Sequence, residues 1–212
     1  MKRSSTTAVA LPNRFERRRE RTRQELLAAA TRVLAEKGLH ETKVTDIAAA
    51  ADVGVGTFYL HFPDKETLFD AVVEETVHRL KATVDAARER ARSPLEKVVA
   101  ANRAFFRFAR DNREVFKIVF GHAAAYNDLI RRAQALFIAD IEKEIREGIA
   151  SGAFVPLPPA LVAQAVVGMA TQVISWWTEH ESVPIETLIE TTTTLALHGI
   201  TPGAAAKGAR HG

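Results

Sequence analysis

The chain of 212 residues contains no cysteine, and this absence excludes disulfide frameworks, thiolate zinc sites and thiol nucleophiles. Aromatic residues make up only 7% of the chain, and no window alternates apolar and polar residues as a half-buried strand does. Apolar residues recur instead at helical spacing, so the sequence predicts an all-α fold. Hydrophobic residues form 47% and charged residues 26% of the chain, as in a globular protein with a buried core.

The sequence also lacks the short motifs of common catalytic sites. It contains no P-loop, no H-E-x-x-H zinc motif and no G-x-S-x-G nucleophile elbow. Gly54 and Gly56 are followed by Tyr59 where a dinucleotide-binding loop requires a third glycine. We therefore expect neither an enzyme, a cofactor nor a metal site. An all-α enzyme or a plain ligand carrier is the alternative from a different class.

Positive charge is concentrated at the N-terminus. Residues 1–23 contain eight Lys and Arg against two Glu, a net charge of +6, whereas the whole chain carries +3. A basic arm on a slightly acidic body favours a polyanionic partner at one end, and the simpler alternative is a solvated tail. We expect residues 1–19 to form a flexible basic arm, which is too polar for a signal peptide.

One stretch, residues 154–178, carries no charge and is long enough to span a membrane. Three prolines lie near its start, and Gln164, Thr171, Gln172 and Ser175 interrupt the remainder. This content favours a buried or subunit-interface helix over a membrane span. We therefore expect a cytoplasmic protein that is not attached to a membrane.

Helical periodicity extends over most of the chain. Thr22 and Glu25 indicate a capping box near the start of the first helix, and Gly38 marks its end. Asp64 is expected to cap a later helix, and Pro94 fits the first position of the next. The expected helices cover about 44–51, 55–62, 65–91, from 94 to about 109, 113–120, 127–150, 158–179 and 185–198. The segment 203–212 is of low complexity and is expected to be flexible.

Two short helices joined by a tight turn, beside a basic arm, are the arrangement of a protein that reads the major groove of DNA. The second short helix begins with two glycines, which let its backbone approach another surface closely. Thr57, Tyr59 and His61 carry donors suited to phosphate oxygens. Phe58 and Phe62 are four residues apart, so we expect them to point inward and anchor this helix to the core.

Residues 44–69 resemble the DNA-binding domain of the TetR family of bacterial transcriptional repressors. The resemblance rests on the spacing Ile-Ala-x-x-Ala, the run Gly-Thr-Phe-Tyr-x-His-Phe and the exit Asp-Lys-Glu-x-Leu-Phe, in this order. It covers about residues 20–70, and the rest of the chain is similar only in length, helicity and a Ser-Gly-Ala-Phe turn. The resemblance implies a helix-turn-helix DNA-binding domain over 20–66 and a helical ligand-binding and dimerisation domain over 67–202.

The resemblance implies DNA contacts for a set of residues at matching positions. Tyr59, His61 and Lys65 match phosphate contacts, and the start of the second short helix matches the part nearest base edges. Lys43 stands where many members of the family have Ser or Thr. Its side chain cannot cap the helix, so Thr42 is expected to do so. Lys43 can still reach a phosphate as a point charge. The predicted DNA-binding residues are Lys43, Thr45, Val55, Gly56, Thr57, Tyr59, His61 and Lys65.

Direct reading of bases by this helix is expected to be limited, because Val55 and Gly56 offer no polar side chain. Base contacts then fall to Thr45, to Thr57 and to apolar contacts with thymine methyl groups. The arginines of the arm are expected to enter a minor groove. Thr45 could alternatively be no more than a first-turn residue, and His61 could help to position the phosphate contacts.

The resemblance also implies a ligand cavity among the C-terminal helices, which hold most of the aromatic residues. Walls of Phe, Trp and Ile suit a flat or apolar small molecule, although each ring could instead belong to the core. No arginine cluster is apparent there for a highly anionic ligand. The predicted ligand-binding residues are Phe106, Phe120, His122, Tyr126, Phe137, Gln172 and Trp176, with Asn127 as a further polar candidate.

The last two helices are expected to form a homodimer as a four-helix bundle, because residues 167–171 place small side chains in mid-helix. The alternative places Trp176 and Trp177 in the core of one subunit. The sequence thus predicts a ligand-responsive repressor that binds a palindromic operator in double-stranded DNA as a dimer. A small hydrophobic or aromatic effector would release it. An activator or dual regulator of the same fold is the first alternative.

Overall fold

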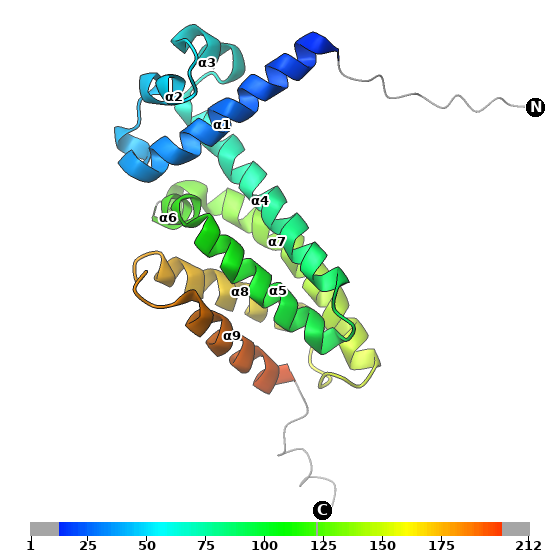
Figure 1. The fold of residues 1–212 in the computed structure, drawn as a ribbon. Coiled ribbons are helices and arrows are strands. Elements are labelled where there is room, and N and C mark those ends of the chain that lie inside the picture. The colour runs from blue at the N-terminus through cyan, green and yellow to red at the C-terminus, as the bar shows by residue number, and fades with distance from the viewer. Residues whose placement is uncertain (1–12, 122, 201–212) are drawn as a thin grey trace, which may run out of the picture. The chain divides into compact units, whose positions relative to one another are not determined.

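The computed structural model describes residues 13–121 and 123–200, and this part of the chain contains helices and no strand, which confirms the predicted all-α fold. The chain divides into an N-terminal unit (Met1–Val72) and a C-terminal unit (Val73–Gly212), and the boundary falls within α4. The helices labelled in Figure 1 are α1 (Arg14–Glu41), α2 (Val44–Ala50), α3 (Val55–His61), α4 (Lys65–Glu89), α5 (Pro94–Asp111), α6 (Arg113–Gly121), α7 (Ala123–Ala150), α8 (Pro159–Trp177) and α9 (Ile185–Ile200).

Helix α1 begins earlier than the sequence predicted. The Oδ1 atom of Asn13 accepts hydrogen bonds from the N–H groups of Phe15 and Glu16, both at 2.9 Å, and the Glu16 carboxylate accepts from the Asn13 N–H at 2.7 Å. This is a complete capping box, so the predicted start near Thr22 is wrong. Residues 14–19 of the predicted flexible arm are therefore helical. The remainder of the arm and the segment 203–212 lie outside the described residues.

The C-terminal end of α1 is shaped by Gly38 and Thr42. Gly38 breaks the helical backbone at a φ of 75°, as its residue type predicted. Thr42 is buried and its hydroxyl donates to the Gly38 carbonyl at 2.7 Å, so it does not cap α2, contrary to the prediction. The Asp46 carboxylate instead accepts from the Lys43 N–H at 3.1 Å, and it pairs with Lys37 at 3.0 Å. These hydrogen bonds, chiefly that from Lys37, lower the pKa of Asp46.

The core of the N-terminal unit fixes α3. Phe58 and Phe62 are buried, as predicted, and their rings lie 6.1 Å apart. Helix α2 packs against both α1 and α3, and its buried residues are Ile47 and Ala48. The chain then enters α4 through Asp64, whose carboxylate accepts from the Thr67 N–H at 2.6 Å and caps the helix as predicted. Buried aromatic rings thus hold the short recognition helix from within.

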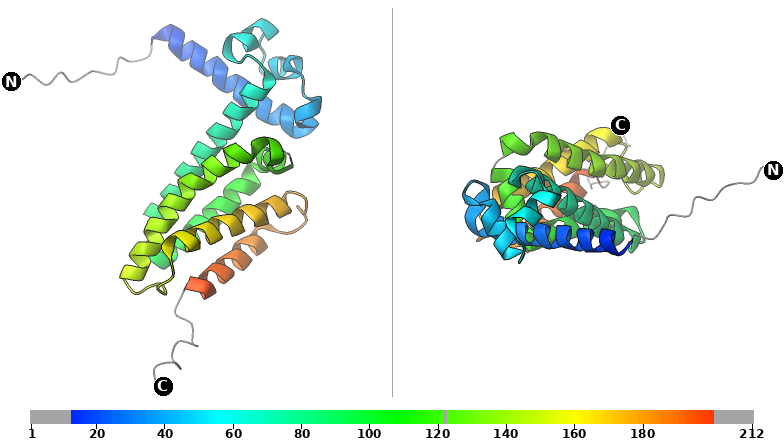
Figure 2. Two further views of the ribbon diagram at one scale, coloured as in Figure 1. Left: turned by 180° about the vertical axis from the view of Figure 1, so that it is seen from behind. Right: turned by 90° about the horizontal axis from the view of Figure 1, so that it is seen from above.

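The C-terminal unit is built from longer helices. Helix α5 begins as predicted, with Ser93 accepting from the Glu96 N–H at 3.2 Å and Pro94 in the first turn. Helix α7 packs along α8, α5 packs along α9, and α8 and α9 lie side by side (Figure 2). One core cluster of this unit joins α5, α8 and α9 and consists of Phe106, Ala109, Ile174, Trp177, Ile185, Leu188 and Ile189.

The turn between α7 and α8 is closely packed. Gly152 adopts a φ of 75°, which returns the chain toward α7. The buried ring of Phe154 then lies directly over Gly148, where a Cβ atom would overlap the ring. Glycine at 148 is therefore required for this turn to close.

Candidate DNA-binding surface and ligand cavity

The outer surface of α3 is open to solvent. Val55 and Gly56 are exposed, and Tyr59 is 55% exposed although its ring meets the buried Phe58 ring edge-on at 5.4 Å. A Cβ atom at Gly56 would meet no other atom within 4 Å. Thr57 is half-buried in the same helix. The N-terminal part of α3 can therefore approach another surface closely, with the Tyr59 hydroxyl available at its side.

The start of α2 is also exposed. Both Lys43 and Thr45 are exposed there, and the Asp46 carboxylate caps this helix end through the Lys43 N–H. The Lys43 ammonium therefore remains available to solvent, as its predicted phosphate contact requires. None of the eight predicted DNA-binding residues is fully buried, and the two whose surroundings differ from the prediction are His61 and Lys65.

His61 lies close to two arginines of α1, Arg19 and Arg23, and the prediction treated Arg19 as part of a flexible arm. Burial lowers the pKa of His61, and the charges of Arg19 and Arg23 lower it further. The Arg23 guanidinium also lies 5.5 Å from the centroid of the Phe62 ring. Arg19 and Arg23 are four residues apart on one helix, so that spacing could have indicated a shared face. They add positive charge beside the C-terminal end of α3.

Lys65 is half-buried, and its ammonium group is hydrogen-bonded within the N-terminal unit. Its Nζ atom donates to the carbonyl oxygens of Leu39 at 2.9 Å, Thr42 at 3.0 Å and His40 at 3.3 Å. An ammonium has three donors, and here each has a carbonyl acceptor. This geometry contradicts the predicted phosphate contact of the Lys65 side chain. The physical reason is that the last carbonyls of α1 have no partner within their own helix, and a cation satisfies them.

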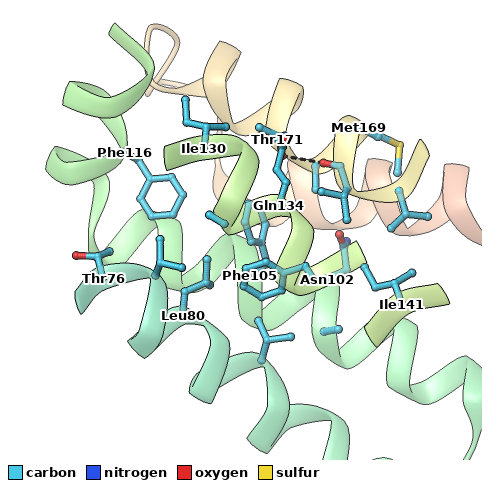
Figure 3. A pocket seen from close by; sticks show the side chains of 18 of the residues that line it. Thr76, Leu80, Asn102, Phe105, Phe116, Ile130, Gln134, Ile141, Met169 and Thr171 are labelled. Atoms are coloured by element: carbon cyan, nitrogen blue, oxygen red, sulfur yellow. Dashed lines mark hydrogen bonds between the residues drawn. The ribbon is translucent and has the colours of Figure 1, made fainter. Parts of the chain in front are cut away.

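The C-terminal unit contains a cavity of about 160 Å³. Its walls come from α4 to α9 and are mostly apolar, and Phe105, Phe116 and Ile141 are among the side chains that line it (Figure 3). Helix α4 contributes residues from Val73 to Arg88, a distance of roughly 22 Å at the rise of an α-helix. The lining of the cavity therefore extends along much of α4 in this unit.

The structure separates the predicted ligand-binding residues into three groups. Phe120 and Phe137 line the cavity. Phe106 is fully buried in the α5–α8–α9 core cluster and lines no part of the cavity, so that placement was wrong. The side chains of His122, Tyr126 and Asn127 lie outside the described residues.

The two predicted α8 residues face away from the cavity. Gln172 is exposed, and Trp176 is half-exposed with its ring stacked on His180 at 4.2 Å between centroids. Their neighbours Thr171 and Trp177 point inward: Thr171 lines the cavity, and Trp177 is buried and donates to the Val183 carbonyl at 2.8 Å. The error is one of helical face, because adjacent residues of an α-helix differ by about 100° in direction.

Several polar groups of the cavity were not predicted. Asn102 of α5 donates to the hydroxyls of Thr192 at 2.8 Å and Thr193 at 2.9 Å on α9. Gln134 of α7 donates to Thr171 at 3.2 Å, drawn as a dashed line in Figure 3. In the sequence, Asn102 and Gln134 are each a single amide among apolar residues at helical spacing. This pattern could have indicated that they face the cavity. Hydrogen bonds between helices satisfy both amides.

A cluster of charged residues lies where α4 meets α7 in the C-terminal unit. Arg88 of α4 is buried, with its Nε atom 3.3 Å from Glu144 and its Nη1 atom 3.5 Å from Asp85 and 3.6 Å from Asp140. Lys81 pairs with Asp140 at 2.8 Å. Burial raises the pKa of Glu144, and the charge of Arg88 opposes this rise. Both Arg88 and Glu144 line the cavity.

Within residues 13–121 and 123–200, no group of three or more His, Asp or Glu could hold a metal ion. In the same part of the chain, α8 has the length and composition of a membrane span, and 28% of its apolar window is buried. The cavity and the surface of α2 and α3 are therefore the candidate functional sites.

Comparison with known proteins agrees with this arrangement. Residues 26–72 match the family model described as bacterial regulatory proteins, tetR family, and residues 91–200 match that of the tetracyclin repressor-like C-terminal domain. The HTH-type transcriptional regulator YhgD of Bacillus subtilis is 29% identical over 168 residues, covering 77% of this chain and 88% of the relative. The HTH-type transcriptional repressor KstR2 of Mycolicibacterium smegmatis is 28% identical over 188 residues, covering 84% and 90%.

A solved structure shares the fold. The transcriptional regulator FadR of Bacillus subtilis, in complex with stearoyl-CoA, superposes with a TM-score of 0.73 at 20% identity, covering 83% of this chain and 98% of the other. The second family model alone covers more than half of the chain, and the relatives are named as transcription regulators. The chain therefore belongs to the TetR family of bacterial transcription regulators, with a helix-turn-helix unit followed by a helical ligand-binding domain.

Proposed function

We propose that this protein is a cytoplasmic repressor that binds a palindromic operator as a homodimer and releases it when an extended apolar effector fills the cavity. The observation that carries the proposal is the mostly apolar cavity in the C-terminal unit of a chain whose N-terminal unit is a helix-turn-helix. An apolar space inside a protein costs stability through lost packing, so its presence favours a ligand.

The surface of α2 and α3 supports binding to DNA. Val55, Gly56 and Thr57 stand at the start of α3, where a recognition helix meets base edges. Tyr59 and Lys43 are exposed at positions suited to phosphate contacts, and the charges of Arg19 and Arg23 lie beside His61. Lys65 contributes by holding the end of α1, rather than through its ammonium group.

The cavity supports an effector with an extended apolar chain. Its volume of about 160 Å³ lies below the roughly 300–1,000 Å³ of common ligand pockets, yet it follows about 22 Å of α4. A fused ring system needs more width than such a space offers, whereas an acyl chain fits its shape. The stearoyl-CoA of the FadR complex has a chain of this kind. A ligand larger than the cavity fits only when the walls move. It therefore binds the conformation with displaced walls more tightly than the conformation without ligand.

The exposed apolar side chains of α8 and α9 support the homodimer. Leu161 of α8 is 67% exposed and Leu195 of α9 is 60% exposed, and Trp176 adds a half-exposed ring. Such a surface marks an interface. A second copy of the same two helices would bury it as a four-helix bundle, and this accounts for the apolar composition of α8 without a membrane.

The proposal is tested by measuring effector and operator binding on the same full-length protein. The operator is first selected from randomised DNA, and its half-sites are expected to lie about 34–36 Å apart. Saturated acyl chains of increasing length are then titrated with and without operator. Reciprocity requires operator to weaken effector binding by the factor by which effector weakens operator binding, typically about 5–150-fold. Equal effector affinity in both titrations would contradict the proposal.

The direction of regulation is tested separately. A reporter gene placed behind the selected operator is expected to be silent with the protein and expressed when effector is added. Expression that depends on the protein would instead identify an activator. The variant Tyr59→Phe serves as a control, because it removes only the hydroxyl expected to contact a phosphate and should weaken binding to all DNA sequences about equally.

A further inference from the structure

The polar groups that line the cavity fall into two classes. Asn102 and Gln134 are already hydrogen-bonded to hydroxyls of neighbouring helices. Arg88 is not: its side chain is 8% exposed, and its Nε and Nη1 atoms are buried without a hydrogen-bond acceptor. The carboxylates at 3.3–3.6 Å neutralise its charge but do not stand in hydrogen-bonding geometry.

Unfilled hydrogen-bonding capacity of this kind is unusual in a protein interior. Buried polar atoms are nearly always paired, and leaving one unpaired costs the full desolvation penalty of the group. Arg88 and Glu144 both line the cavity, from α4 and α7. The Nε and Nη1 atoms themselves are buried, so a molecule at this end of the cavity reaches them when its entry moves the walls, and it then meets N–H donors without acceptors and a carboxylate beside them.

The charges of the cluster restrict what the molecule can present there. Two cations, Lys81 and Arg88, face three carboxylates, Asp85, Asp140 and Glu144. Farther out, the exposed Glu147 pairs at 4.0 Å with both Lys97 and Lys143, where solvent screens their charges. Ionised, the five inner groups carry one surplus negative charge, so a carboxylate or phosphate of the ligand would add like charge. A ligand ammonium would face the guanidinium of Arg88.

We propose that the Arg88–Glu144 end of the cavity binds an uncharged hydroxyl group at one end of an otherwise apolar effector. The hydroxyl oxygen accepts hydrogen bonds from the unpaired N–H groups of Arg88. The O–H group donates a hydrogen bond to the carboxylate of Glu144. A hydroxyl satisfies both sides without changing the net charge of the cluster. The inference rests on the proposed function, since it names the polar end of the same effector.

The test compares four probes that share one alkyl chain: decanol, decane, decanoate and decylammonium. Each displaces a fluorescent apolar dye from the full-length dimer at neutral pH, without DNA. Decanol is expected to bind roughly 10- to 100-fold more tightly than decane, because it gains hydrogen bonds to charged groups. The two charged probes are expected to bind more weakly than decanol. Equal binding of decanol and decane, or tighter binding of decanoate or decylammonium, would overturn the inference.

Two variants assign the effect to the cluster. Arg88→Met keeps the length of the side chain and removes the donors, so the preference for decanol over decane should disappear. Glu144→Gln keeps an acceptor and removes the surplus charge, so decanoate should gain affinity while the preference for decanol persists. Glu190→Gln, an exposed carboxylate on α9 away from the cavity, is the matched control and should change nothing. If Arg88→Met fails to fold, the affinity of Glu144→Gln for decanoate still tests the inference, and an affinity no higher than that of the wild type would contradict it.

The outcomes separate this inference from the proposed function. Probes that all bind alike and still release operator would overturn the hydroxyl site and leave the proposed function standing. Probes that show the expected order but do not release operator would support the hydroxyl site and count against the proposed repressor mechanism. Failure of every probe to bind would overturn both.

Discussion

The two units of this chain differ in how completely one cation of each is hydrogen-bonded. In the N-terminal unit each donor of the Lys65 ammonium meets a carbonyl oxygen, and Asn13, Asp46 and Asp64 cap helix starts. In the C-terminal unit Arg88 is buried with donors that have no acceptor, beside a cavity. A unit that reads DNA must present one fixed surface, whereas a unit that senses a ligand must keep both space and bonding capacity unfilled.

The largest expected effect comes from removing one aromatic ring from each unit. Phe58→Ala deletes a fully buried ring of the N-terminal unit and should lower the free energy of unfolding by about 3–5 kcal/mol. Phe137→Ala deletes a ring that already faces a cavity, so we expect a loss of only about 1–2 kcal/mol. Hydrogen exchange, followed separately in the two units, measures both losses. Equal losses would show that the two units are packed alike.

The next effect concerns the satisfied cation. Lys65→Met leaves the carbonyls of residues 39, 40 and 42 without their donor and should destabilise the N-terminal unit by about 3 kcal/mol. Operator binding should be lost as this unit unfolds, while binding of an effector to the cavity persists. Lys143→Met, at an exposed site of α7, is the matched control. A loss of DNA affinity with an unchanged N-terminal unit would restore Lys65 as a phosphate contact.

A smaller effect tests whether the C-terminal unit is loosely packed throughout. Gly148→Ala places a Cβ atom against the ring of Phe154 and should cost about 1–3 kcal/mol by overpacking. Adding Phe154→Leu removes the planar ring, and the double variant should recover part of that loss. Thermal unfolding followed by Trp fluorescence measures both variants, since both Trp residues belong to this unit. No loss in the single variant would mean that the turn between α7 and α8 adjusts freely.

The smallest effect is a pH dependence of the N-terminal unit. Because burial and the charges of Arg19 and Arg23 lower the pKa of His61, the folded state disfavours the protonated ring. The resulting stability is present above the unfolded pKa of about 6.5 and is lost as the pH falls below it. A DNA phosphate acts in the opposite sense, since it favours protonated His61. Operator affinity should therefore rise roughly 3-fold between about pH 7.5 and pH 6.

The control for this prediction is His61→Gln, which keeps a polar side chain and cannot be protonated. Its operator affinity should lack the rise at low pH. Fluorescence anisotropy at constant ionic strength gives the affinities, because changes in salt alter DNA binding by themselves. The same rise in wild type and variant would assign the pH dependence to another group.

Much of the fold could be predicted because its signals are local. Phe58 and Phe62, the Asp64 cap and the start of α5 at Ser93 and Pro94 each depend on a few adjacent residues. The start of α1 could not be decided in this way. Asn13 with Glu16 and Thr22 with Glu25 both have the spacing of a capping box, and only the full length of the helix decides between them.

The two candidate sites differ in how local their sequence signals are. The predicted DNA-binding residues come from one contiguous motif, and most of them are exposed in the structure. The cavity combines residues from six helices. On α8 the prediction named Gln172, which is exposed, whereas its neighbour Thr171 lines the cavity. Arg88 and Glu144 were missed because charged residues on a helix are usually solvated, and only tertiary packing buries this pair.

The hydrogen bonds from Lys65 to the end of α1 also affect how fast the N-terminal unit folds. They join residues 23 to 26 positions apart and so close a loop that contains both α2 and α3. The entropic cost of closing a loop grows only slowly with its length, and a loop of about 10 residues closes in roughly 10–100 ns. During synthesis this loop is complete once Lys65 leaves the ribosome. We therefore expect the DNA-reading helices to assemble while the ligand-sensing part is still being translated.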